Sequence, residues 1–281
     1  MDLGVFLMGQ PLDCFESAPY LCEIKLRRIK LHDVVATSGP QNGQLVSLAD
    51  LKKMDVNGNP CSDLLNHLLI LVGTCLVIEV HSPSPPINGH PHKFLNNLRN
   101  LPNFTTIQLH GSGRMGSHVR FTGPSGEVKM LVGYSQSDET WLSLESLAQF
   151  DTLRTKWLEI IHGDPLSSTS IYQALLPMRG LRTLTLSQSV DPNVFIHALD
   201  PTMSLSGLVT CPKLEKLDAE RWQTIDIKKD IGMAAARVSR GAKLKSIRII
   251  SWDRVGYSQI SALELEKHVS HVECSVWSGG L

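Results

Sequence analysis

Apolar residues recur along the chain in a six-residue pattern, L-x-x-L-x-L, in which other apolar residues can replace leucine. Copies of the pattern begin at residues 21, 51, 75, 104, 155, 181, 214, 244 and 269, the copy at 155 being the weakest. The period is about 28 residues, and only the interval from 104 to 155 is nearly twice as long. This spacing is typical of leucine-rich repeats, and it predicts one short strand for each copy.

The same pattern predicts how the strands are covered. Side chains alternate between the two faces of a strand, so the apolar positions of each copy face inward together. Helical patterns fill most intervals: Asp191-Pro192 is a typical helix start, and the run 225–240 ends before Gly241, a typical helix C-cap. We therefore predict an α/β fold in which residues 1–281 form a single irregular leucine-rich-repeat solenoid, with parallel strands on its concave side and helices on its convex side.

The doubled interval predicts an insertion. Two β-like runs flank the turn sequence Gly123-Pro124-Ser125-Gly126, which indicates an inserted β-hairpin and loop over 111–140. Residues 111–116 also match G-x-G-x-x-G, a dinucleotide-binding fingerprint. The fingerprint requires a helix after its third glycine, and the β-like sequence that follows does not predict one. A nucleotide-dependent enzyme that uses this glycine loop is therefore a remote alternative.

Residues between the inward positions line the predicted concave face, which is the usual binding surface of a solenoid. The candidate partner-binding residues are Lys25, Asp55, Glu79, Gln108, Glu159, Thr185, Asp218, Glu220, Arg248 and Glu273. Charged side chains on an exposed strand face also serve solubility, so the pattern supports binding for the face as a whole more than for any single residue. Three tryptophans, Trp222, Trp252 and Trp277, fall at equivalent positions of the last three copies. They are either stacked core residues or exposed aromatic anchors for a partner.

Composition and charge limit the classes of partner that the chain is expected to bind. The chain has 281 residues, 27 basic and 27 acidic side chains and 42% hydrophobic residues. This balance gives no basic excess for nucleic acid or for a membrane surface. The longest apolar stretch, 64–80, contains Asn66, His67 and Glu79, and the first ten residues lack the basic start of a signal peptide. We predict an intracellular protein, cytoplasmic or nuclear, that binds neither nucleic acid nor membrane.

No familiar catalytic or metal-binding signature occurs. G-x-S-x-G, H-E-x-x-H, the Walker loop and C-x-x-C are all missing, and the six cysteines are scattered. His90 and His92 lie in the proline-rich segment 82–94, where solvated histidines are commoner than metal ligands. We predict no catalytic residue, no cofactor and no metal site.

The amino-acid sequences of the later repeats are distinctive. The segments "LRTLTLSQSVDPNVFIHALDP", "CPKLEKLDAE", "SRGAKLKSIRII" and "LEKHVSHVECSV" together resemble the F-box and leucine-rich-repeat proteins expanded in mushroom-forming (basidiomycete) fungi. The resemblance is best from about residue 150 onward. It concerns the repeat region only, because no F-box-like "LPPE" opening precedes the first repeat.

In that family the F-box docks onto the Skp adaptor of an SCF ubiquitin ligase, and the repeats present substrates. The resemblance therefore implies a non-catalytic scaffold that binds an unknown protein partner or substrate, with a Skp-type adaptor as a partner only if an F-box lies upstream. The alternative is a truncated paralogue or structural remnant without a binding role of its own. Oligomeric state and the identity of the partner stay open.

Overall fold

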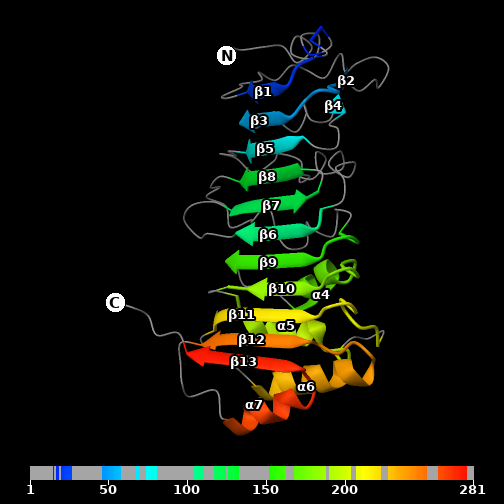
Figure 1. Cartoon of the computed structure of the whole chain (residues 1–281), viewed down its shortest axis with the longest axis vertical. Coiled ribbons are helices and arrows are strands. Elements are labelled where there is room, and N and C mark those ends of the chain that lie inside the picture. The colour runs from blue at the N-terminus through cyan, green and yellow to red at the C-terminus, as the bar shows by residue number, and fades with distance from the viewer. Residues whose placement is uncertain are drawn as a thin grey trace. The chain divides into compact units, whose positions relative to one another are not determined.

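The structure of the chain is a computed structural model. It describes residues 15, 17–18, 20–26, 46–57, 68–69, 74–80, 104–110, 117–124, 126–132, 152–162, 168–187, 190–203, 207–222, 227–251 and 259–276. The chain divides into two compact units, and Figure 1 labels their strands and helices. Unit 1 comprises Met1–Phe104 and Gly113–Ser143, and unit 2 comprises Thr105–Ser112 and Leu144–Leu281.

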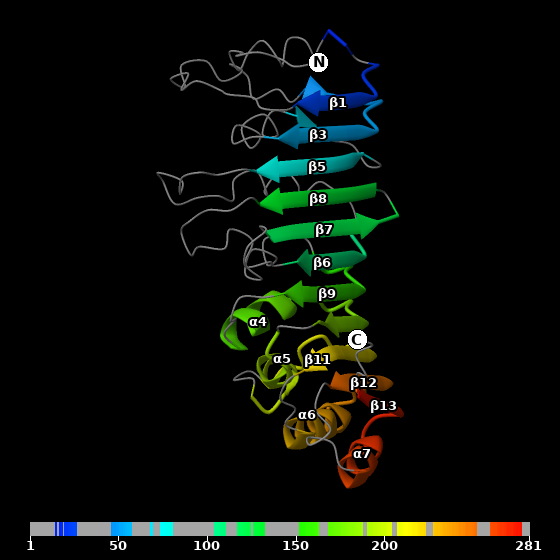
Figure 2. The same ribbon diagram turned by 90° about the vertical axis from the view of Figure 1, so that its left-hand side faces the viewer.

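Unit 2 contains a parallel sheet with helices on one face. Its strands lie in the order β6-β9-β10-β11-β12-β13, which is also their order in the chain. Their bounds are β6 Thr106–His110, β9 Trp157–His162, β10 Thr183–Leu186, β11 Lys216–Trp222, β12 Ser246–Ser251 and β13 His271–Val276. The connecting helices are α4 Ser168–Leu175, α5 Pro192–Leu199, α6 Ile227–Ser239 and α7 Gln259–Glu266 (Figure 2).

The first residue of the apolar pattern forms a turn just before the strand. Its backbone N–H donates to the carbonyl three residues earlier, as in Leu51 to Leu48 (3.2 Å), Thr155 to Thr152 (3.0 Å), Leu181 to Met178 (3.1 Å) and Leu214 to Cys211 (3.0 Å). The turn buries this residue and directs the chain into the sheet, where the next two apolar residues are buried. The same local turn thus satisfies backbone groups before β3 in unit 1 and before β9, β10 and β11 in unit 2.

The helices of unit 2 begin and end at residues suited to those positions. The Asp191 carboxylate accepts from the Asn193 N–H at 2.9 Å, so it caps the first turn of α5, and Pro192 supplies a preset φ at the first helical position. After α6 the chain turns at Gly241, whose φ of 74° is one that side-chain-bearing residues rarely adopt. Each helix packs against its sequence neighbour.

A buried arginine joins three segments of unit 2. Arg237 of α6 is fully buried, and its guanidinium donates to the carbonyls of Thr210 at 2.8 Å, Cys211 at 2.9 Å and Leu199 at 3.4 Å. Leu199 is the last residue of α5, where the helix macrodipole is negative. Burial lowers the pKa of Arg237, so the surrounding carbonyls offset a real desolvation cost.

The strands of unit 1 lie side by side in the order β1-β3-β5-β8-β7. Its strands are β1 Glu23–Leu26, β3 Lys53–Asn57, β5 Cys75–Val80, β7 Ser117–Gly123 and β8 Gly126–Val132, and a separate short parallel pair joins β2 Val46–Ser47 to β4 Leu68–Leu69. The strands β7 and β8 form an antiparallel hairpin in which Gly123 lies opposite Gly126, as the turn sequence predicts. Buried residues of the hairpin reach the core of unit 1, where Phe121 contacts Phe104 with ring centroids 5.0 Å apart.

The predicted strands are confirmed, but the predicted leucine-rich-repeat solenoid is wrong. The sheet of unit 1 is mixed, because β7 runs antiparallel to β8, and β8 pairs with β5 where a regular repeat would supply the next strand. The helices whose bounds the structure describes all lie between residues 168 and 266, so strand and helix do not alternate through the described part of the chain. The physical reason is that an open strand edge pairs with any strand that satisfies its backbone, and the hairpin brings its own buried residues, Val119 and Val128.

Candidate functional site

Six of the predicted partner-binding residues form one row across unit 2. Parallel pairing places them opposite one another on successive strands, from β6 to β13. The row consists of Gln108, Glu159, Thr185, Asp218, Arg248 and Glu273. Because residues two apart on a strand share a face, the rows on either side belong to the same surface.

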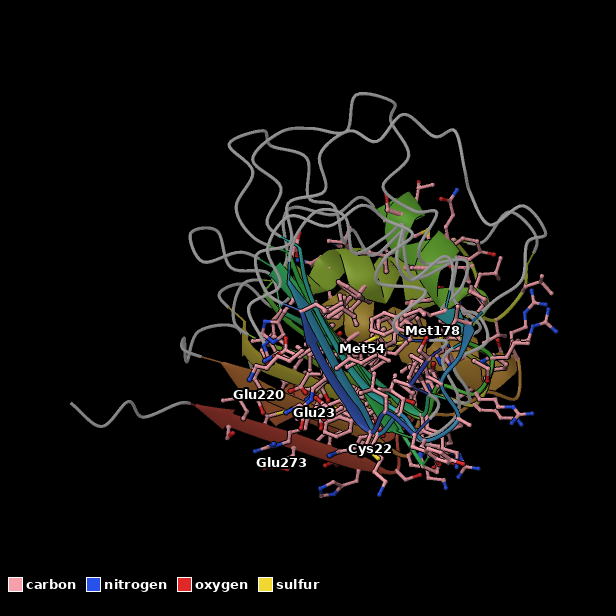
Figure 3. The ribbon with its side chains drawn as sticks, turned by 90° about the horizontal axis from the view of Figure 1, so that it is seen from above. Cys22, Glu23, Met54, Met178, Glu220 and Glu273 are labelled. Carbon is pink, nitrogen blue, oxygen red and sulfur yellow. The ribbon has the colours of Figure 1, made fainter. Side chains whose placement is uncertain are left out.

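We call this surface the polar face of unit 2. It comprises the central row, the preceding row and three residues of the following row. The preceding row is Thr106, Trp157, Thr183, Lys216, Ser246 and His271, and the following row contributes Glu220, Ile250 and Ser275. Figure 3 shows Glu220 and Glu273 on the side of the sheet away from the helices, whereas Met178 lies on the helix side.

Ion pairs connect neighbouring strands of the polar face. Arg248 lies between two carboxylates, with Nη1 3.8 Å from Glu220 Oε1 and Nε 3.5 Å from Glu273 Oε1. These side chains are well exposed, so solvent screens both pairs, and each contributes roughly 0–1 kcal/mol to stability. Their main consequence is to hold an alternating pattern of charge at the end of the sheet.

A closer pair lies in the middle of the face. Lys216 Nζ is 2.8 Å from Asp218 Oδ2, and the Asp218 side chain is only 10% exposed. The other carboxylate oxygen, Oδ1, is buried and has no hydrogen-bond partner. A buried carboxylate oxygen without a donor is unfavourable, so Asp218 is the polar group of this face whose bonding capacity is least satisfied among those the structure describes.

Trp157 belongs to this surface but was not among the predicted partner-binding residues. Its side chain is 39% exposed, and its indole Nε1 donates to Thr185 Oγ1 at 3.1 Å on the neighbouring strand. Beside it, Gln108 Nε2 donates to Glu159 Oε2 at 2.6 Å. A sequence signal existed, because Trp157 directly precedes the inward Leu158 and must therefore point outward.

The remaining candidate residues belong to unit 1. Lys25 is exposed and lies opposite the partly buried Asp55 in the pairing of β1 with β3. On the same face Lys53 Nζ lies 3.6 Å from Glu23 Oε1. The backbone of Glu79 pairs with Leu131 of β8, and its side chain lies outside the described residues. Unit 1 therefore has a charged face of its own, with Lys25 and Asp55 in one row.

Several predictions fall outside the described residues. These are the glycine segment 111–116, the histidines His90 and His92, and the side chains of Trp222, Trp252 and Trp277. The segment that follows the glycines is described, and it is strand β7. A dinucleotide fingerprint needs a helix at that place to hold the pyrophosphate, so the remote nucleotide-binding alternative loses its structural basis.

No group of three or more His, Cys, Asp or Glu side chains among the described residues could hold a metal ion. None of the helices in the described part of the chain is long and apolar enough to cross a membrane. Of the described cysteines, Cys22 and Cys274 are exposed, Cys75 is partly buried and Cys211 is buried.

Comparison with known proteins identifies no family for the chain. No protein-family model matches the sequence, and no curated protein matches it significantly.

Proposed function

We propose that the chain is a non-catalytic protein-interaction module that binds a partner or substrate protein through the polar face of unit 2. The role is that of the substrate-recognition region of an F-box protein, the receptor subunit of an SCF-type ubiquitin ligase. The observation that carries the proposal is the continuous row of polar side chains in register across six strands. The resemblance of the repeats to F-box proteins supports the ubiquitin-ligase part.

A sheet face of this kind suits a protein partner for physical reasons. Strand backbones hold the side chains in a fixed array, so little conformational entropy is lost when a partner binds. The paired charges of Glu220, Arg248 and Glu273 give the array a definite electrostatic pattern. Such patterns set specificity and association rate more than affinity.

Charge reversal at two exposed residues tests the proposal. Glu220→Lys together with Glu273→Lys reverses the carboxylates on both sides of Arg248 and leaves the buried Asp218 in place. The matched control is Glu264→Lys with Glu266→Lys on α7, which changes the net charge equally away from the polar face. Partners are captured on each immobilised variant and identified by mass spectrometry, and the purified partner is then titrated by calorimetry.

We expect the polar-face variant to bind the purified partner at least about tenfold more weakly, because like charges would oppose one another across the interface. The α7 control should bind like the wild type. Equal affinity of all three proteins would remove the polar face from the proposal. The ubiquitin-ligase part is tested separately, by whether the full-length protein co-purifies with a Skp-type adaptor.

A further inference from the structure

The middle of the polar face combines an exposed aromatic ring with carboxylates. Among the strand residues that the structure describes, Trp157 is the exposed large hydrophobic side chain. Its indole N–H is held by Thr185, so the ring is fixed against the neighbouring strand β10. A fixed indole ring on a polar surface is a preformed contact for a cation, since the ring face is electrostatically negative.

Two carboxylates flank the residue that holds the ring. Glu159 and Asp218 lie on either side of Thr185 in the central row, on β9 and β11. Neighbouring strands are about 4.8 Å apart, so the backbones of these two residues are separated by roughly 10 Å. A cation above Thr185 would therefore lie between the two carboxylates.

The bonding of the carboxylates leaves capacity for a further donor. Glu159 accepts from Gln108 through Oε2, and Asp218 contacts Lys216 through Oδ2. Asp218 Oδ1 has no partner, although the residue is only 7% exposed. Because Oδ1 itself is buried, a ligand would meet only the exposed tenth of the Asp218 side chain, where solvent screens its attraction to a cation less than at a fully exposed carboxylate.

The charge of the whole polar face indicates the sign of the ligand. It carries the carboxylates of Glu159, Asp218, Glu220 and Glu273, but only two permanent cations, Lys216 and Arg248. A net acidic surface attracts a basic partner segment and repels nucleic acid. Arginine suits it better than lysine, because a planar guanidinium can stack on the indole and donate to a carboxylate at the same time.

From these observations we infer that Trp157, Glu159 and Asp218 form a receptor for an arginine side chain on a basic segment of the partner protein. This inference rests on the proposed function, and it names the chemistry that the polar face recognises. Arg248, with Glu220 and Glu273, lies beside this receptor and would orient the rest of the segment.

A synthetic peptide with arginine at every third position tests the inference. It is labelled with fluorescein and titrated against the full chain by fluorescence anisotropy. The comparison peptide has citrulline at each arginine, which preserves shape and removes charge. We expect saturable binding of the arginine peptide and at least about tenfold weaker binding of the citrulline peptide, since charge-assisted hydrogen bonds to carboxylates are lost.

Substitutions locate the binding. Trp157→Leu should weaken the arginine peptide about threefold to fivefold, the size expected for a cation and an exposed aromatic ring. Asp218→Asn and Glu159→Gln should each weaken it about tenfold, and Glu264→Gln on α7 is the control that should not. Circular dichroism and thermal melting verify folding, and Glu159→Gln keeps the test valid if Asp218→Asn is unstable.

The indole proton resonance of Trp157, assigned by its loss in Trp157→Phe, should shift as the arginine peptide is added. Equal affinity for the arginine and citrulline peptides, or for wild type and the three site variants, would overturn the inference. So would calcium ions that shift the same resonance and displace the peptide, because the carboxylates would then serve a metal. If the peptide fails to bind but charge reversal at Glu220 and Glu273 still removes the partner, the inference fails and the proposed function stands.

Discussion

Replacing Arg237 by methionine should strongly destabilise unit 2, although methionine is apolar and of similar length. Buried ion pairs can often be replaced by apolar residues at no cost, because both charged partners are removed together. Here the partners are backbone carbonyls of Thr210, Cys211 and Leu199, which no side-chain substitution removes. The variant would leave the Thr210 carbonyl without the 2.8 Å bond that the guanidinium donates to it, whereas Cys211 O still accepts from Leu214 N–H.

The magnitude follows from the two short bonds. Hydrogen bonds from a charged donor contribute about 1.5–3 kcal/mol each, so the bonds to Thr210 and Cys211 amount to about 3–6 kcal/mol. Part of this is offset, because the variant no longer has to bury a guanidinium. We expect a net loss of about 3 kcal/mol in the free energy of unfolding. For a chain of this size that loss lowers the midpoint of thermal unfolding by about 6–12 °C.

The assay is urea denaturation of the full chain, followed by far-ultraviolet circular dichroism and by tryptophan fluorescence. Arg240→Met is the matched control, because Arg240 is an exposed arginine directly after α6 and its loss should change stability by no more than about 0.5 kcal/mol. Arg237→Lys should fall between the two, since an ammonium cannot reproduce the planar fork. If Arg237→Met is as stable as Arg240→Met, the three carbonyl contacts do not stabilise the fold and the reasoning is refuted.

Two further perturbations test the packing and the protonation of unit 2. Gly180→Ala should destabilise the protein by about 1–3 kcal/mol, because the new Cβ would come within 2.5 Å of the Leu153 carbonyl oxygen. Gly232→Ala in α6 meets nothing within 4 Å and should stabilise the protein by about 0.5–1 kcal/mol. Urea titrations of both variants measure the changes in the free energy of unfolding, and changes of the same sign would contradict the explanation. Burial raises the pKa of the Cys211 thiol from 9.0 to about 12, so the stability linked to its protonated form is fully present below pH 9 and is lost as the pH rises toward 12. Wild type should therefore lose more stability than Cys211→Ser between about pH 8 and pH 10.5, and parallel curves would exclude Cys211 as the cause.

The outward positions of the polar face could be predicted, but their environments could not. Strand alternation is a local property, so Leu158, Leu184 and Leu217 in the core imply Glu159, Thr185 and Asp218 on the opposite face. The burial of Asp218 depends on neighbouring side chains of the assembled sheet, which no single repeat contains. Trp157 was not among the predicted residues, because these came from the position between the last two inward residues of each copy, with Glu220 added, although the same alternation applies to Trp157.

Arg237 shows a different limit of sequence reasoning. In the sequence it is one arginine near the end of an amphipathic helix, where arginines are ordinarily solvated and interact with the helix dipole. Its burial depends on three carbonyls from residues 26 to 38 positions earlier in the chain. Such partners converge only when α5, the turn at Cys211 and α6 are packed together.

What the sequence determined by itself is therefore local: the nine strands, the caps of α5 and α6 and the hairpin at Gly123–Gly126. These follow from side-chain alternation, backbone preferences and capping chemistry, which act over a few residues. Which strands became neighbours was decided only in the tertiary structure, where β8 took the place beside β5 and made the sheet of unit 1 mixed. The physical reason is that strand edges distant in sequence can each accept a given strand, and apolar periodicity alone does not specify which edge pairs with it.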